Sequence, residues 1–399
     1  MTSAKIDFGL DTNYGMTAPV EKPASGENKT MLLGMKQNKT YHYRITATGS
    51  GGDCVSPDYT TTTGAILNTV PKLTVNNKST SSPLFGGFLI LGQYLQMGGG
   101  APAYILDKDN EGVWAWQFSK DVTGAVMDYS GTHMWLNNAN VPNGQAAVHR
   151  VAMDGSTDED LSSKFSGLNH QLTVFSPDKG ATEVVAFYAY GGSCDDIKEY
   201  DVGTGNVKTI VNSGKVVNAS ACHCNNIQYS PEDDTLVFSE LDTQTVAKIK
   251  RSDGSVVWKL NGNSPTITGV SWKGGDHGIH VLSADNLLVF NNNSRMSMGG
   301  AGAAGGDGSG SIVIELKLNV SAKTGSQVWS YKANPGIQND VMGDMQRLPN
   351  GNTIIGYSTK GVVHEVSENG TLLQELTWPG GSSFGYIQKR ATLYGPPPR

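Results

Sequence analysis

The chain has 399 residues, of which 38% are hydrophobic and 17% charged, so it can bury one large core or two smaller ones. Its 30 basic and 36 acidic residues give a net charge of −6 and form no basic block, which argues against a nucleic-acid partner. No apolar run reaches the roughly 18 residues of a membrane span, and the N-terminus contains no signal-peptide core. We therefore expect either a cytosolic protein or one whose leader is absent from this chain. We expect the second case, a secreted or periplasmic protein.

Residues 1–64 are predicted to form one small β unit. A turn at 36–39 precedes an alternating strand over 40–47, and a Thr-rich strand follows over 58–63. The T-Y-x-Y-R pattern that begins at Thr40 resembles the last strands of a fibronectin type III (Fn3) domain, where a tyrosine makes the corner hydrogen bond. The resemblance implies a small β-sandwich-like segment, and His42 is expected to face solvent.

From about residue 84 a repeat takes over, marked by a hairpin turn with glycine and a following strand. The glycines recur about every 45–50 residues, apart from one longer interval that contains the glycine-rich stretch 298–310. They are Gly112, Gly155, Gly205, Gly254, Gly325 and Gly370. Six such units predict an all-β fold, a six-bladed β-propeller over residues 65–399. Stretch 298–310 is expected to be a flexible loop inserted in the fifth blade, and Trp116, Trp258 and Trp329 are expected to pack between blades.

Three histidines occupy matching positions in three consecutive repeats. His170, His223 and His277 each lie six or seven residues before a serine of the following turn. In a propeller the innermost strands line the central channel, so these imidazoles are expected to meet at one mouth of it. Imidazoles serve there as nucleophiles, acids or bases, anion binders or metal ligands. The other histidines of the propeller are assigned to outer positions: His133, His149 and His364.

The four cysteines allow a disulfide between Cys194 and either Cys222 or Cys224. Cys222-His223-Cys224 also suggests zinc, but the pattern lacks a second ligand pair at zinc-knuckle spacing. We expect the disulfide and no metal.

The segment 165–375 resembles the bacterial and fungal arylsulfotransferases, which are six-bladed propellers. The resemblance is carried by H-x-N-x-I-x-Y-x-x-x-D-D-x-L-V-x-S, which begins at His223, and by the segment that begins at His277. It implies a cofactor-free, PAPS-independent transfer of a sulfuryl group from a phenolic sulfate ester to a phenol. By motif, His277 matches the histidine nucleophile that is transiently sulfated, while His170 and His223 match histidines that bind sulfate oxygens and handle protons.

The substrate contacts expected at this site include one departure from the family. Glu240 stands where the family usually has an arginine that contacts sulfate, and a carboxylate there would repel the anion unless it is protonated or turned away. Arg295, Arg347 and Lys389 are the candidate replacements. The expected phenol lining is aromatic, and His280 is expected either behind His277 or packed. The candidate substrate-binding residues are Asn225, Tyr229, Glu240, His280 and Arg295, with Trp272 and Phe384 as further aromatic candidates.

Three functions remain open at this point. The first is an aryl-sulfate sulfotransferase with a phenol and a phenolic sulfate as small-molecule partners. The second is a catalytically inactive family relative that acts as a secreted binding or structural assembly module, self-associating as a homo-oligomer; Glu240 and the low charge favour it. The third is a polysaccharide lyase, which would need more basic residues in the channel than the sequence offers.

Overall fold

The computed structural model describes residues 2–20, 28–94, 99–139, 146–295 and 305–396. In these ranges the chain is almost entirely β-structure, which confirms the all-β class. The helical elements are one short helix and three 3-10 turns: α1 (Ser213–Val217), η1 (Ser162–Phe165), η2 (Ser358–Lys360) and η3 (Pro379–Gly381). No helix in the described ranges is both long and apolar enough to cross a membrane.

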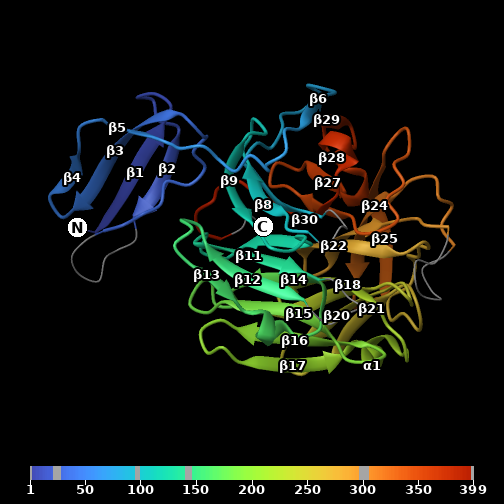
Figure 1. Ribbon diagram of the computed structural model, residues 1–399. Helices are drawn as coiled ribbons and strands as arrows, with labels where there is room; N and C mark the ends of the chain where they lie inside the picture. The colour runs from blue at the N-terminus through green and yellow to red at the C-terminus, as the bar shows by residue number, and fades with distance from the viewer. Residues whose placement is uncertain (1, 21–27, 95–98, 140–145, 296–304, 397–399) are drawn as a thin grey trace.

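The N-terminal segment forms one antiparallel sheet beside the rest of the molecule (Figure 1). Its strands are β1 (Ser3–Gly9), β2 (Met16–Val20), β3 (Thr40–Gly49), β4 (Gly52–Val55) and β5 (Tyr59–Thr62). β4 and β5 follow one another along the same edge of β3. All five strands of the described segment therefore belong to one sheet, and none is available to form a second sheet that would pack against it. The β-sandwich-like arrangement expected here is therefore wrong for the described part of the segment.

Tyr41 nevertheless makes the corner hydrogen bond that its motif predicted. Its ring is buried, and its hydroxyl accepts the backbone N–H of Lys36 at 2.8 Å. The Lys36 ammonium in turn lies within 3.3 Å of carboxylates in the hairpin that joins β8 (Pro102–Leu106) to β9 (Gly112–Gln117), so this corner also ties the N-terminal sheet to the larger unit. His42 is partly exposed, and its Nδ1 lies 2.7 Å from Asp58 Oδ2.

The remaining strands form six antiparallel sheets within the described residues, and four of these are built from strands in sequential order. The first four sheets contain β10 (Gly124–Met127), β11 (His133–Asn138), β12 (Ala147–Ala152) and β13 (Asp158–Asp160); β14 (Leu168–Phe175), β15 (Val184–Tyr190), β16 (Asp195–Asp201) and β17 (Val207–Asn212); β18 (Cys224–Ser230), β19 (Thr235–Glu240), β20 (Thr245–Lys250) and β21 (Val256–Leu260); β22 (Asp276–Ser283), β23 (Asn286–Asn291), β24 (Ile312–Asn319) and β25 (Thr324–Lys332).

The last two sheets join distant parts of the chain. One contains β26 (Asp344–Arg347), β27 (Thr353–Tyr357), β28 (Val362–Val366) and β29 (Leu372–Thr377), with β6 (Thr74–Asn77) added at its outer edge. The other places the C-terminal strand β30 (Phe384–Arg390) beside β7 (Phe88–Gln93), β8 (Pro102–Leu106) and β9 (Gly112–Gln117). The innermost strands contact one another in the closed order β10, β14, β18, β22, β26, β30 and back to β10, which is the arrangement of a propeller.

Apolar side chains fill the space between neighbouring sheets. Trp258 is 2% exposed and packs between the β18–β21 and β22–β25 sheets, as its position after a turn glycine predicted. Trp116 and Trp329 are only partly buried, each at the margin of such a cluster. The propeller therefore has an interface core between adjacent sheets instead of one central core.

Four of the six turn glycines have the positive φ that was predicted for a tight hairpin. Those at residues 155, 205, 254 and 370 have φ between 70° and 83°, which suits tight hairpins. Gly112 and Gly325 instead lie in strands β9 and β25, and Asn110 and Lys323 take the positive φ two residues earlier. The glycine-rich stretch 298–310 connects β23 to β24, and its first part lies outside the described residues.

Candidate active site

The three histidines of the repeat come together where the innermost strands begin. His170 lies in β14, His277 in β22, and His223 directly before β18. The Nε2 atoms of His170 and His223 are 3.2 Å apart, and their ring centroids 4.7 Å. The ring centroids of His170 and His277 are 6.1 Å apart. Three consecutive sheets thus supply one imidazole each to a single cluster.

Bulges at the start of the innermost strands change the direction in which the three histidine side chains point. Pairing is interrupted between Asn169 and Leu172 in β14, just after Cys224 in β18, and between Asp276 and Gly278 in β22. His170 itself has φ of 54°, in the left-handed region. Bulges redirect side chains and are common beside active sites. The alternation of a regular strand therefore does not apply at the histidines.

Hydrogen bonds assign the proton positions in the His170–His223 pair. The Asn169 amide nitrogen donates to Asp195 Oδ2 at 3.0 Å, so its Oδ1 faces His170 and accepts from Nδ1 at 2.5 Å. A neutral His170 then carries its lone pair on Nε2. His223 Nε2 must be the donor across the 3.2 Å contact, which leaves His223 Nδ1 as an acceptor.

The same logic applies to His277. Its Nδ1 lies 2.6 Å from Asn292 Oδ1, and the Asn292 amide nitrogen donates to the carbonyl oxygens of Asn339 at 2.6 Å and Met342 at 2.9 Å. Carbonyls only accept, so the amide orientation is fixed and His277 Nδ1 must donate. The lone pair of a neutral His277 is therefore on Nε2.

Burial keeps two of the three imidazoles uncharged. Desolvation lowers the pKa of His277 to about 4, with a smaller contribution from the nearby His223. Desolvation also lowers the pKa of His170 well below its usual range, assisted by His223 and His277. A neutral imidazole is the form that can act as a nucleophile or base.

Buried carboxyls surround the cluster, and sequence reasoning did not single them out. Asp195 accepts the N–H of Cys224 at 3.1 Å, and burial raises its pKa. Burial raises the pKa of Asp276 to about 8 and that of Asp344 to about 7. Asp276 adjoins His277 in the chain, and this adjacency was the available signal. At neutral pH Asp276 is largely protonated, so it adds little negative charge near a bound anion.

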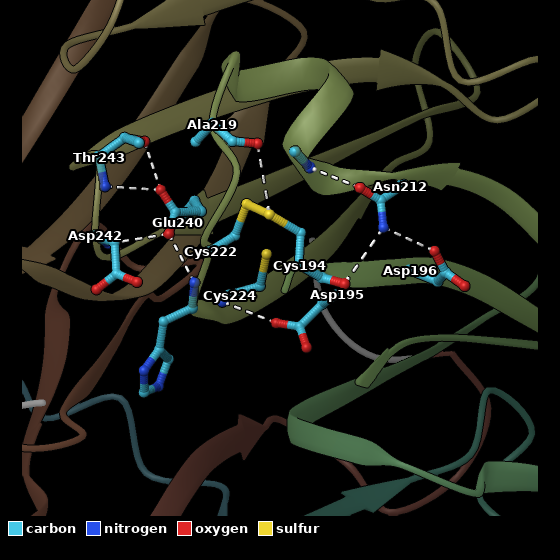
Figure 2. Close-up of a disulfide and its surroundings, with 12 residues drawn as sticks. Cys194, Asp195, Asp196, Asn212, Ala219, Cys222, Cys224, Glu240, Asp242 and Thr243 are labelled. Carbon is cyan, nitrogen blue, oxygen red and sulfur yellow. Dashed lines mark hydrogen bonds between the residues drawn. A yellow bond between two sulfur atoms is a disulfide. The ribbon is translucent and has the colours of Figure 1, made fainter. Parts of the chain in front are cut away.

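Glu240 is fully buried and bonds the chain around it. Its carboxylate accepts the backbone N–H groups of His223 at 2.7 Å, Asp242 at 2.9 Å and Thr243 at 2.8 Å, together with the Thr243 hydroxyl (Figure 2). Burial raises its pKa, whereas these hydrogen bonds favour the charged form. The substrate contact predicted for Glu240 is not found. It anchors the backbone of His223 instead.

The candidate replacement cations make their contacts elsewhere. Arg295 is exposed, and its Nε donates to the carbonyl oxygen of Asp307. Arg347 pairs with Glu315 Oε2 at 2.5 Å and donates to a backbone carbonyl. Lys389 is buried in β30. The sulfate contact predicted for Arg295 is therefore not found.

The predicted aromatic lining is largely core. Tyr229 lies near the far end of β18, where its ring stacks on Phe175 at 4.0 Å and its hydroxyl donates to a carboxylate. Trp272 is buried and donates to Asp276 Oδ1 at 3.3 Å, while Phe384 packs on Trp378. Tyr229 lies six residues along the chain from His223, at the other end of β18, so its ring is not brought to the histidine cluster. A role for Tyr229 in substrate lining stays a prediction.

Asn225 and His280 occupy different surroundings. Asn225 is buried, donates to the carbonyl of Asp276 at 2.7 Å, and its Oδ1 has no hydrogen-bond partner among the described residues. It is thus bonded to the strand that carries His277. His280 instead faces the neighbouring sheet, where its Nδ1 accepts the N–H of Arg347 at 2.9 Å beside a cavity of about 500 Å³. Desolvation lowers the pKa of His280 to about 4. The substrate contact predicted for His280 is therefore not found.

A disulfide between Cys194 and Cys222 lies directly beside the cluster (Figure 2). This confirms one of the two predicted pairings, while Cys224 is a buried free thiol. Cys222 precedes His223, and Cys194 precedes Asp195, whose carboxylate bonds Asn169 and the backbone of Cys224. The bond therefore joins the two segments that hold His170 and His223.

Replacing both disulfide cysteines with alanine (C194A/C222A) is expected to lower the free energy of unfolding by about 3–4 kcal/mol, the chain-entropy value for a loop of this size. The two residues are 28 apart in sequence. Guanidinium unfolding measures the change. Cys54→Ala is the control, because Cys54 is exposed and free. Equal stability of the double variant and this control would show that the disulfide does not stabilise the fold.

Comparison with known proteins relates part of this chain to one family. Residues 208–384 match the arylsulfotransferase (ASST) family model. The match spans less than half of the chain and includes His223 and His277, whereas His170 precedes it. It supports the family expected from the sequence. No curated protein matches the chain.

Solved structures give only distant likenesses. A chain of a nidogen/laminin complex is 10% identical, with a TM-score of 0.48 over 75% of this chain and 97% of that one. TolB from Acinetobacter baumannii is 12% identical, with a TM-score of 0.46 over 93% and 81%. The β-propeller domain of Cps50 (Swd1) from Myceliophteria thermophila is 9% identical, with a TM-score of 0.45 over 78% and 92%. Similarity at this level says nothing about activity.

Proposed function

We propose that this protein is an aryl-sulfate sulfotransferase that moves a sulfuryl group from a phenolic sulfate ester to a phenol through His277. The observation that carries the proposal is the buried His277 ring, whose Nδ1 donates to Asn292 so that a lone pair is left on Nε2, and whose centroid lies 6.1 Å from that of the His170 ring. The family match over residues 208–384 supports the same chemistry.

In the first step the lone pair on His277 Nε2 attacks sulfur. The N–S bond forms as the S–O bond to the aryl group breaks, and the phenolate leaves with that electron pair. The Nε2–H of His223 donates to His170 in the resting site, and in this mechanism it turns to the sulfuryl oxygens, where it stabilises their charge. Sulfated His277 keeps its Nδ1 proton and is an imidazolium.

In the second step the acceptor phenol attacks the same sulfur. The N–S bond breaks, its electron pair returns to Nε2, and the acceptor proton passes to the free Nδ1 of His223. His223 then releases this proton to solvent, which replaces the proton that the first phenolate took from solvent, so the enzyme returns to its starting state. The Cys194–Cys222 disulfide supports a secreted or periplasmic location for this reaction, because disulfides persist in oxidising compartments.

The activity is tested by incubating the protein with 4-nitrophenyl sulfate and phenol. The expected result is release of 4-nitrophenol together with an equal amount of phenyl sulfate. Release without phenyl sulfate would indicate hydrolysis. Absence of both would overturn the proposal and favour the inactive binding or assembly module, for which Glu240 at the family's arginine position is the favouring observation.

The pH dependence of kcat/KM should reflect the buried nucleophile of the free enzyme. Protonation removes the lone pair of His277, so kcat/KM is expected to fall as pH drops through a value near 4, below the ordinary histidine range. Measuring kcat/KM downward from about pH 8, with circular dichroism at each pH to follow folding, checks this. An acid limb near pH 6.5 in folded protein would mean that the reacting group is solvated.

A further inference from the structure

Asn292 is the hydrogen-bond partner of the proposed nucleophile, His277. It is 1% exposed and directly follows β23. Its side chain links the end of β23 to His277 in β22 and to the segment before β26. Its Oδ1 accepts from His277 Nδ1, and its amide nitrogen donates to two carbonyls of the segment that leads into β26. Rotating the amide by 180° would place oxygen against both carbonyls and leave the buried His277 N–H facing an amide N–H. The orientation is therefore strongly enforced.

The choice of an amide oxygen has a chemical consequence. A carboxylate next to Nδ1 favours the imidazolium and can take up the ring proton. An amide oxygen accepts the hydrogen bond but does not take the proton. The sulfated ring therefore stays cationic, and a cationic imidazole leaves sulfur more readily than a neutral one.

The same arrangement recurs at His170, where Asn169 Oδ1 accepts from Nδ1 and its amide nitrogen is held by Asp195. Two of the three clustered histidines thus have an asparagine on Nδ1. The ionisable groups near His277 are His170 and His223 across the cluster, Asp276 on its own strand, and Asp344 packed against Gly278. None of these is the hydrogen-bond partner of His277 Nδ1.

We propose that Asn292 is a positioning residue that confines the His277 proton to Nδ1, presents the lone pair at Nε2 and keeps the sulfated ring cationic for transfer to the phenol. The proposal rests on the proposed function for its catalytic consequence. Its structural part stands independently, because the position of the proton can be measured without turnover.

The first test is long-range 1H–15N NMR of the wild-type protein with 15N-labelled histidine, with His277 assigned by comparison with His277→Gln. We expect Nδ1 to be protonated and Nε2 to be bare at neutral pH. A proton on Nε2 would overturn the proposal, whether or not the protein transfers sulfate. This result is thus separate from failure of the sulfotransferase assay.

The second test is Asn292→Ala. We expect Nε2 of His277 to gain proton occupancy in the same spectrum, and kcat to fall by about 10²-fold with little change in KM. The matched control is Asn352→Ala, which removes a buried amide that also donates two hydrogen bonds, to Pro83 and Glu365, in another sheet. Equal losses of kcat in the two variants, or an unchanged His277 spectrum in Asn292→Ala, would reduce Asn292 to a structural role and overturn the proposal.

Discussion

His277→Ala is expected to lower kcat for sulfate transfer from 4-nitrophenyl sulfate to phenol by about 10³-fold or more, because it removes the atom that forms the covalent bond to sulfur. The variant should still fold, since His277 makes one side-chain hydrogen bond and loses only a small buried volume. Loss of turnover with an unchanged unfolding midpoint would assign the defect to chemistry.

His364→Ala is the matched control for this variant. His364 is also buried, in β28 of the sheet next to β22–β25, and bonds Tyr331 of β25 and Glu375 of β29. It is expected to lose some stability and to keep most of its kcat. If His277→Ala retained turnover within tenfold of the wild type, the nucleophile would have to be another group.

Glu240→Arg is expected to destabilise the fold by about 3–5 kcal/mol and not to gain activity. The substitution removes the acceptor for three backbone N–H groups and one hydroxyl, and places an unpaired cation in a site that is fully buried. Because one of those N–H groups belongs to His223, the cluster should also lose its geometry. Chemical denaturation measures the change in the free energy of unfolding.

Glu240→Gln separates charge from hydrogen bonding at this position. Its amide oxygen can still accept from His223 and Asp242, so its loss of stability should be clearly smaller than that of Glu240→Arg. A stable Glu240→Arg variant with increased turnover would show that the carboxylate is dispensable and that an arginine suits this position.

The repeat and the position of the histidines could be predicted from the sequence because both depend on spacing. Each sheet repeats the same short strands and turns, so a residue at a fixed distance from a turn serine recurs at the same place in successive sheets. That is why His170, His223 and His277 come together where the innermost strands begin. Trp258 was predictable for the same reason.

Other features depend on contacts that spacing does not encode. Glu240 accepts the N–H of Thr243 in the turn after β19 and the N–H of His223, which directly precedes β18. These two N–H groups lie close together only once β18 and β19 have paired as a hairpin. The direction in which His280 points could not be predicted, because the bulge in β22 interrupts the regular alternation of side chains. The single N-terminal sheet could not be predicted either, because it depends on β4 and β5 both pairing with β3. Asn292 lies fifteen residues from His277 and meets it only through the pairing of β22 with β23.

The most direct measurement is mass spectrometry of the protein quenched after brief mixing with 4-nitrophenyl sulfate in the absence of a phenol acceptor, with digestion at neutral or alkaline pH to preserve an N–S bond. We expect one sulfuryl group on the peptide that contains His277, formed with a stoichiometric burst of 4-nitrophenol and discharged when phenol is added. A sulfuryl group on another residue, or acceptor-dependent turnover with no burst and no modified peptide, would contradict transfer through His277.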